Sequence, residues 1–213
     1  MPLNKWTKQE VKIIVLGLGN PGKKYQNTRH NIGRALVKTW AEKLSLTWQR
    51  EKIFSAEIAK RGRLWLVKPT TMMNQSGQTA TRLIKANQLI TDPSPTLKQI
   101  KLLSANQSTA KNNSSLAKEQ KKINLLVVHD ELDLRLGQWR LSWGKSSPSH
   151  KGVLSIEQAL QTKAFWRLRI GVDNRNPENR LPGQAYVLQK FLPKEKKSLK
   201  IVFKEILIHL EKE

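Results

Sequence analysis

The pattern of apolar and polar positions divides the chain into alternating strands and helices. An unbroken apolar run at 13–16 ends at Gly17 and is typical of a strand buried on both faces. Apolar residues then recur at helical spacing from Ile32 to Leu44. Further strands are predicted over 53–59, 64–67, 123–128, 138–143 and 166–172, and further helices over 76–89, over 152–161 and from Pro193 onward. This alternation predicts an α/β fold, a single domain with a central mixed β-sheet flanked by helices.

The segment 90–122 departs from this alternation. It is rich in Ser, Asn, Gln and Lys and shows no sustained period. A connection of this length without regular structure is uncommon inside a compact domain. We therefore predict one domain over 1–213 that carries a low-complexity surface insertion at about 90–122, with a short helix near 97–103 and no part in the chemistry.

Polar side chains follow several of the predicted strands at their carboxyl ends. Asn20 and His30 come after the first strand, Asn74 follows the third, and His129 and Asp130 end the strand at 123–128. Open α/β sheets bind ligands at this edge, so we expect these groups to converge. A carboxylate beside an imidazole fixes its tautomer, and amides can hold an oxyanion. The rim therefore favours general-base hydrolysis of an ester or another activated carbonyl.

Two other interpretations of these motifs stay open at this point. Residues 17–22 match the G-x-G-x-x-G dinucleotide fingerprint, but Pro21 and the polar stretch 23–28 lengthen the loop before the helix. A tight turn that presents Asn20 fits better. Asp130, Glu131 and the nearby Asp133 could bind Mg²⁺ or cap a helix, although the sequence offers no second cluster of carboxylates.

Charge and composition narrow the class of partner. Lys and Arg number 39 against 16 Asp and Glu, which gives a formal net charge of +23. Such a surface should face a polyanion, and we favour nucleic acid because no basic amphipathic anchor stands out. Cysteine is absent, which excludes thiolate metal sites and cysteine nucleophiles and agrees with a reducing compartment. No apolar stretch approaches the roughly 20 residues of a membrane span, so we expect no membrane association.

The motifs together resemble those of bacterial-type peptidyl-tRNA hydrolases. The similarity lies in residues 17–22, in Tyr25, and in the runs 28–33, 68–77 and 129–134, with weaker matches at 167–171 and 186–188. It covers about residues 11–210 apart from the insertion. The resemblance implies that family's α/β fold and hydrolysis of the ester between a peptide and the 3′ end of tRNA, which recycles tRNA from prematurely released peptidyl-tRNA. It also implies a cytoplasmic monomer with no metal, no organic cofactor and no obligate protein partner.

The resemblance also implies roles for particular residues. His30 would be the general base, Asp130 would orient it, and Asn20 would recognise the first peptide carbonyl. Asn74 would hold the ester and its developing oxyanion. The side chain of Tyr25 and the backbone of Met72 would line the site for the tRNA end.

Phosphate contacts are implied for Arg140 and Arg169. Two departures from the family pattern affect this region. Lys151 stands where the family has an asparagine that helps to hold substrate and water, and its charge could clamp the terminal phosphates. Ser142 stands where many members carry a second phosphate-binding lysine. An alternative function is therefore a non-catalytic RNA-binding protein of the same fold, such as a splicing-type factor.

Overall fold

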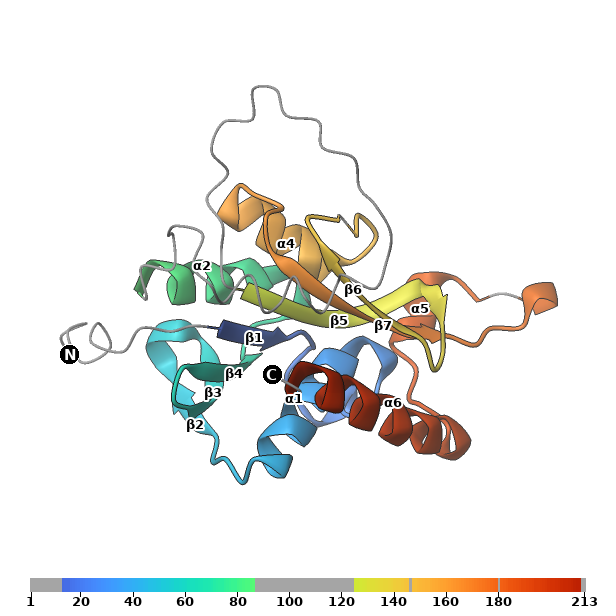
Figure 1. Ribbon diagram of the computed structural model, residues 1–213. Coiled ribbons are helices and arrows are strands. Elements are labelled where there is room, and N and C mark those ends of the chain that lie inside the picture. Colours follow the sequence, from blue (N-terminus) through green and yellow to red (C-terminus); the bar gives the residue numbers. More distant parts are fainter. Residues whose placement is uncertain (1–12, 87–124, 146, 180, 212–213) are drawn as a thin grey trace, which may run out of the picture.

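A mixed β-sheet forms the centre of the molecule (Figure 1). The computed structural model describes residues 13–86, 125–145, 147–179 and 181–211, so the predicted insertion at 90–122 and its short helix lie outside the described residues. Within them the sheet has seven strands in the order β2-β3-β4-β1-β5-β7-β6. The strands are β1 (Ile13–Gly17), β2 (Gln49–Glu51), β3 (Ala56–Arg61), β4 (Leu64–Pro69), β5 (Leu125–Arg135), β6 (Trp139–Trp143) and β7 (Trp166–Asp173).

The middle of this sheet is parallel and its margins are antiparallel. Strand β1 pairs in parallel with β4 on one side and β5 on the other, and β5 pairs in parallel with β7. Strands β2, β3 and β6 add to the margins in antiparallel pairs. Because the chain leaves β1 and returns to both sides of it, a crevice is expected at the carboxyl end of β1.

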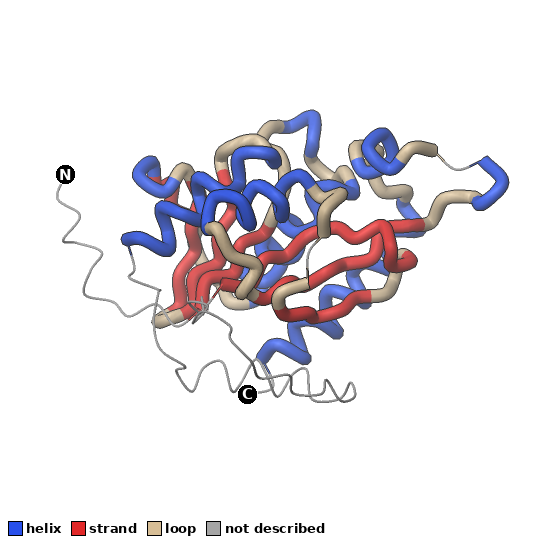
Figure 2. Tube along the Cα trace, turned by 90° about the horizontal axis from the view of Figure 1, so that it is seen from above, coloured by secondary structure: helices blue, strands red, loops and turns tan. Residues whose placement is uncertain are grey.

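Helices cover both faces of the sheet, as Figures 1 and 2 show from two directions. Helices α1 (Ile32–Lys43) and α6 (Pro193–Glu211) lie on one face, with the short α5 (Gly183–Val187). Helices α2 (Ser76–Ala86) and α4 (Lys151–Leu160) lie on the other. The predicted fold class, a mixed sheet between helices, is confirmed. None of the described helices has the length and apolar character that a bilayer crossing requires.

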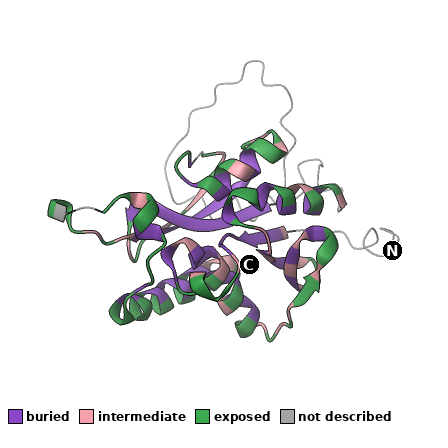
Figure 3. Cartoon of the chain, turned by 180° about the vertical axis from the view of Figure 1, so that it is seen from behind, coloured by how far each residue is buried: buried purple, intermediate pink, exposed green. Residues whose placement is uncertain are grey.

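Each face of the sheet has its own hydrophobic core. In β1, Val15 packs on the α1 and α6 side, while Ile14 and Leu16 pack on the α2 and α4 side. All three side chains are fully buried. Figure 3 shows the same distribution, with buried residues along the sheet and on the inner faces of the helices. Two covered faces explain why the strand is an unbroken apolar run instead of an alternating one.

Strand β5 is longer than its apolar pattern predicts. The apolar run 123–128 predicted that the strand ends near residue 128. The strand continues to Arg135, so His129 and Asp130 lie within it. Pairing with β1 stops where Gly17 meets Val128, and beyond that point β5 pairs only with β7. The polar residues continue the strand because β7 still supplies backbone hydrogen bonds, while the side that β1 has left is open to the loop after β1.

The two arginines of β7 share one face of the strand, as the alternation predicts, but this face is covered. Arg167 is fully buried and its guanidinium donates to Glu157 of α4 at 2.7 Å. Arg169 is 4% exposed, and its Nε donates to Glu131 of β5 at 2.8 Å. The expected contact between Arg169 and a phosphate does not fit this position, because the guanidinium is turned inward to a carboxylate.

Close backbone contact joins the end of β1, the start of α1 and the middle of β5. A Cβ atom at Gly33 would lie 2.2 Å from the carbonyl oxygen of Val128, and one at Gly17 would lie 2.4 Å from that of Gly33. Only glycine allows this approach. The approach brings the turn before α1, which carries His30, against the strand that carries Asp130.

Gly33→Ala should destabilise the protein by roughly 1–3 kcal/mol, because the added methyl must displace backbone atoms in a filled core. Thermal or denaturant unfolding measures the change. The exposed substitution Lys38→Ala on the same helix should stay within about 0.5 kcal/mol of wild type. Equal stability of the two variants would contradict the close packing described above.

Candidate active site

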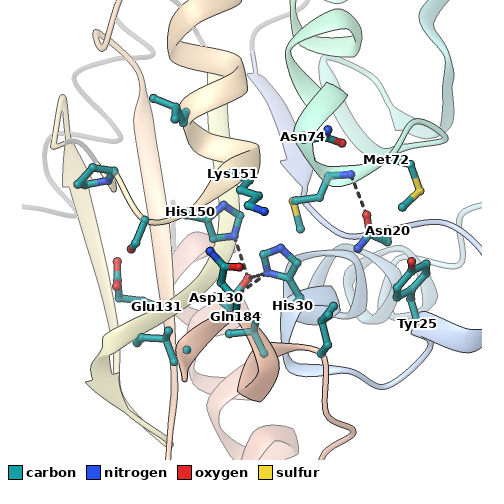
Figure 4. A pocket seen from close by; sticks show the side chains of 18 residues that line it. Asn20, Tyr25, His30, Met72, Asn74, Asp130, Glu131, His150, Lys151 and Gln184 are labelled. Carbon is teal, nitrogen blue, oxygen red and sulfur yellow. Dashed lines mark hydrogen bonds and ion pairs between the residues drawn. The ribbon is translucent and has the colours of Figure 1, made fainter. Parts of the chain in front are cut away.

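A pocket of about 790 Å³ opens at the carboxyl ends of β1 and β4 and beside the extension of β5. All six residues predicted for catalysis and for binding of the tRNA end line it, and Figure 4 shows their arrangement. These residues are Asn20, Tyr25, His30, Met72, Asn74 and Asp130. Residues from α4 and α5 complete the wall. The sequence prediction therefore identified residues that do lie together, although they come from distant parts of the chain.

The carboxylate of Asp130 lies between two imidazole rings. Its Oδ1 is 2.9 Å from Nδ1 of His30 and 2.9 Å from Nε2 of His150 (Figure 4). His150 also accepts the backbone N–H of Val153 at Nδ1, so Nε2 must be its protonated nitrogen and donates to Asp130. His30 donates from Nδ1 in the same way. Its Nε2 therefore keeps a free lone pair, as a general base requires.

The charges around His30 oppose one another. Burial lowers the pKa of its imidazole, but the negative charge and hydrogen bond of Asp130 outweigh burial and hold the pKa above its usual value. The Lys151 ammonium acts in the opposite direction to Asp130. Burial alone would raise the pKa of Asp130, yet His30 and His150 hold it well below its usual range. Asp130 is thus a carboxylate at neutral pH, and it stabilises the imidazolium that forms when His30 takes up a proton.

His129, which the sequence prediction placed at the rim, lies beneath it. Its ring is fully buried, and Nδ1 faces the backbone carbonyl of Asp130 at 2.8 Å. Burial lowers the pKa of His129 to about 3, so its imidazole is too weakly basic to take up a proton at neutral pH. Its ring packs edge-on against His150, with 4.8 Å between the centroids. His129 therefore supports the site from below.

Asn20 is fixed by hydrogen bonds that determine which way its amide points. Its Oδ1 accepts the backbone N–H of Met73 at 2.8 Å (Figure 4). Its backbone N–H and C=O both bond the side-chain amide of Asn31, each at 2.8 Å. Since Met73 supplies a donor, the oxygen of Asn20 must face it. The NH₂ group of Asn20 is left as a hydrogen-bond donor at the pocket.

A buried ion pair anchors the turn that carries His30. Arg29, the preceding residue, donates to both oxygens of Glu195 in α6, at 2.9 and 2.8 Å. Its guanidinium lies over the ring of Tyr186, 4.2 Å from the centroid, and also donates to the carbonyl of Lys190 at 2.9 Å. Thr28 forms a backbone bridge with Lys190. The base is thereby tied to the segment that links α5 to α6, and α5 forms one wall of the pocket.

The three predicted phosphate contacts lie in different surroundings. Arg140 is exposed on β6, where it pairs in register with Arg169 of β7. Arg169 is the buried partner of Glu131 described above. Lys151 begins α4 and lines the pocket itself. Arg140 and Lys151 keep the exposed position that a phosphate contact needs, Arg140 on the outer surface and Lys151 in the pocket, whereas Arg169 does not.

The sequence prediction missed His150 as a site residue. It lies in a short polar segment before α4, with no apolar pattern to place it, and its partner Asp130 is 20 residues away. Two signals were present: a histidine two residues before a predicted helix lies close enough to its start to cap it, and it belongs to the segment that differs from the family pattern. The structure shows both roles, because His150 caps α4 and holds Asp130.

The geometry also tests the two alternative interpretations of the motifs, a dinucleotide-binding loop at 17–22 and a Mg²⁺ site. Helix α1 begins at Ile32, ten positions after Gly22, so the 17–22 loop does not place a helix N-terminus over a pyrophosphate. Among the described residues, potential metal-ligand atoms gather within 4.8 Å at His30, Asp130 and His150. Those nitrogen and oxygen atoms already hydrogen-bond one another, so a cation there would have to break both contacts. The other two carboxylates considered for Mg²⁺ both face a cation of the protein: Glu131 accepts from Arg169 at 2.8 Å, and Asp133 lies 3.9 Å from the same guanidinium.

Comparison with known proteins defines the class to which this fold and pocket belong. The family model for peptidyl-tRNA hydrolase matches residues 14–95 and 103–212. Peptidyl-tRNA hydrolases from two strains of Neisseria meningitidis are each 33% identical to the chain over 181 residues, covering 83% of this chain and 77% of theirs. The crystal structure of peptidyl-tRNA hydrolase from Acinetobacter baumannii superposes with a TM-score of 0.69 at 25% identity, covering 96% of this chain and 91% of that one.

The matched proteins are hydrolases, and the solved structure shares the mixed sheet between helices that this chain forms. The chain belongs to the peptidyl-tRNA hydrolase family. The resemblance inferred from the motifs is confirmed.

Asp130→Asn should lower the pKa of His30, because the substitution removes the charge that raises it. It should also cut hydrolysis by about 10²-fold or more, since an amide supports the imidazolium poorly. In the wild type, the rate should fall as the pH drops through the His30 pKa, because a protonated imidazole cannot accept a proton from water. NMR titration of the imidazole resonances measures the pKa directly.

The control for this prediction is Asp133→Asn, which removes a carboxylate that is 86% exposed. It should leave both the His30 titration and the rate close to wild type. An unchanged His30 pKa in Asp130→Asn would show that the hydrogen bond does not control the base.

Proposed function

We propose that this chain hydrolyses the ester between a peptide, or another N-blocked aminoacyl group, and the 3′ end of tRNA, and so recycles tRNA from prematurely released peptidyl-tRNA. The observation that carries the proposal is the His30–Asp130 pair, which leaves the Nε2 lone pair of His30 available in a pocket that also holds Asn20 and Asn74. Membership of the family supports the same substrate.

The reaction needs one base that later returns its proton. Nε2 of His30 takes a proton from water as the water oxygen bonds to the ester carbonyl carbon, and the carbonyl electron pair moves onto its oxygen. The tetrahedral intermediate then collapses, the bond to the ribose 3′ oxygen breaks, and that oxygen takes the proton from His30. Asp130 stays ionised throughout and stabilises the imidazolium.

The asparagines and the tRNA-end residues position the substrate. Asn20 has an NH₂ donor free at the pocket, suited to the first peptide carbonyl. A free aminoacyl group has no carbonyl there, so Asn20 separates blocked from unblocked esters. Asn74, exposed in the pocket wall, donates to the ester oxygen as charge develops on it. The ring of Tyr25 and the backbone at Met72 receive the terminal nucleotide.

Recognition of the rest of the tRNA relies on exposed positive charge. Arg140 is the phosphate contact that we retain, and the net charge of +23 adds an electrostatic attraction that weakens as salt rises. We further propose that the protein works as a monomer in the cytoplasm, with no obligate protein partner. Neither the family match nor the named relatives favour the alternative of a non-catalytic RNA-binding protein, and such a protein would not need the His30–Asp130 pair.

The decisive assay compares N-acetyl-aminoacyl-tRNA with free aminoacyl-tRNA. The wild-type protein should release the blocked amino acid and leave the free aminoacyl ester intact. His30→Ala should reduce turnover of the blocked ester by about 10²–10⁴-fold while tRNA binding persists. Quench-flow or acid-precipitation assays of the labelled amino acid measure both.

The matched control is His209→Ala, which removes a half-buried histidine of α6 that packs edge-on against Trp139 outside the pocket. Its hydrolysis rate should equal that of the wild type. Binding of tRNA without turnover by the wild-type protein would reject the proposal in favour of the RNA-binding alternative.

A further inference from the structure

Lys151 places a positive charge inside the pocket. It is the first residue of α4, its side chain is exposed to the pocket, and it lines the same wall as His150 (Figure 4). In that view the side chain extends from the start of the helix into the space beside His30. The ammonium group therefore points into the pocket that also holds His30, and its charge acts on that imidazole, although the sequence suggested a role at the terminal phosphates of the tRNA.

No carboxylate among the described residues forms an ion pair with this ammonium. The two acidic side chains of the pocket are already engaged. Asp130 accepts from His30 and His150, and Glu131 accepts from Arg169. The Lys151 charge is left to act on whatever enters the pocket.

The backbone that carries Lys151 is held in place on both sides. His150, the residue before it, is fixed by its bonds to Asp130 and to the N–H of Val153. Gly152, the residue after it, packs so closely that an added Cβ would lie 2.4 Å from the sulfur of Met73. A lysine in the first turn of a helix is also disfavoured by the helix dipole, so helix stability does not account for it.

We propose that Lys151 is a catalytic residue for the proposed hydrolysis: its ammonium stabilises the negative charge that develops on the ester carbonyl oxygen when water attacks. This inference rests on the proposed function and names a further group of the same site. The ammonium takes no proton and forms no bond to carbon. It favours the transition state because the charge it pairs with is present there and not in the neutral ester.

The positive charge of Lys151 also acts on His30, the proposed general base. The groups that face His30 are Asp130 and Glu131 from β5, His150 and Lys151 from the start of α4, and Tyr25 from its own loop. Burial and Lys151 both lower the pKa of His30, and Asp130 raises it. Lys151 thus keeps His30 unprotonated to a lower pH, which extends the working range on the acid side.

The absence of cysteine from the chain allows a sharp test. Lys151→Cys introduces a single thiol, and its thiolate displaces bromide from 2-bromoethylamine to give a thioether analogue of lysine. The same thiol treated with iodoacetamide gives an uncharged side chain of similar length. The two proteins therefore differ at one site in charge, and thermal unfolding of both confirms that they are folded.

Two substrates distinguish a role of Lys151 at the ester from a role at the tRNA phosphates. They are N-acetyl-aminoacyl-tRNA and the N-acetyl-aminoacyl ester of adenosine, which has no phosphate. The aminoethylated protein should hydrolyse both esters with a kcat roughly 10- to 100-fold above that of the amide-alkylated protein. The acid limb of its rate profile should lie at lower pH, and NMR should show a lower pKa for His30. Lys163→Cys, in an exposed lysine just beyond the opposite end of α4, should show no difference between the two alkylations.

Three results would overturn the inference. Equal rates for the two alkylated forms on both esters would show that the charge is not used. A gain confined to the tRNA ester would assign Lys151 to a phosphate instead. If the wild-type protein hydrolyses neither ester, the proposed function fails and this inference fails with it, whereas an active wild type with indifferent alkylated forms rejects the Lys151 role alone.

Discussion

The site depends on keeping the Asp130 carboxylate ionised in the interior of the protein. A buried carboxylate is costly unless hydrogen bonds replace its lost hydration. Here the replacement comes from the ring N–H groups of His30 and His150, each 2.9 Å away. These hydrogen bonds keep the carboxylate ionised, and its charge is available when His30 accepts a proton. An arginine in place of His150 would satisfy the carboxylate equally well but would cancel the charge that the mechanism uses.

That requirement extends to the parts of the fold that hold the two rings. His150 belongs to the start of α4, so the helix on one face of the sheet positions Asp130. His30 precedes α1 on the other face, and the ion pair between Arg29 and Glu195 holds its turn against α6. Loss of one partner of such a buried pair typically costs about 3–5 kcal/mol, because the other charge is stranded. The pocket is therefore built from both helical layers, and the sheet edge between them is where they meet.

Sequence patterns within one strand or helix could be interpreted, whereas contacts between side chains of different elements could not. Local periodicity predicted β1, α1 and α6, because one strand or helix is enough to produce it. Asn20, His30 and Asp130 were identified because polar residues that follow buried strands must gather at one edge of the sheet. The inward turn of Arg169 could not be predicted, because its partner Glu131 lies on a different strand. The hydrogen bond between Asp130 and His150 could not be predicted for the same reason, because only the placement of α4 brings the two residues together.

The link between Arg29 and Glu195 also sets an order of events during synthesis. The two residues are 166 positions apart, and the segment that bridges Thr28 is made only shortly before Glu195. Domains begin to fold from the N-terminal side as the chain emerges. The strand β1 and helix α1 can associate early, but the turn that carries the base lacks the ion pair of Arg29 with Glu195 until α6 has emerged. A chain still attached to its own tRNA through most of its synthesis thus lacks the support that its proposed catalytic histidine requires, so the ability to cut such an ester arises late in the life of the molecule that carries it.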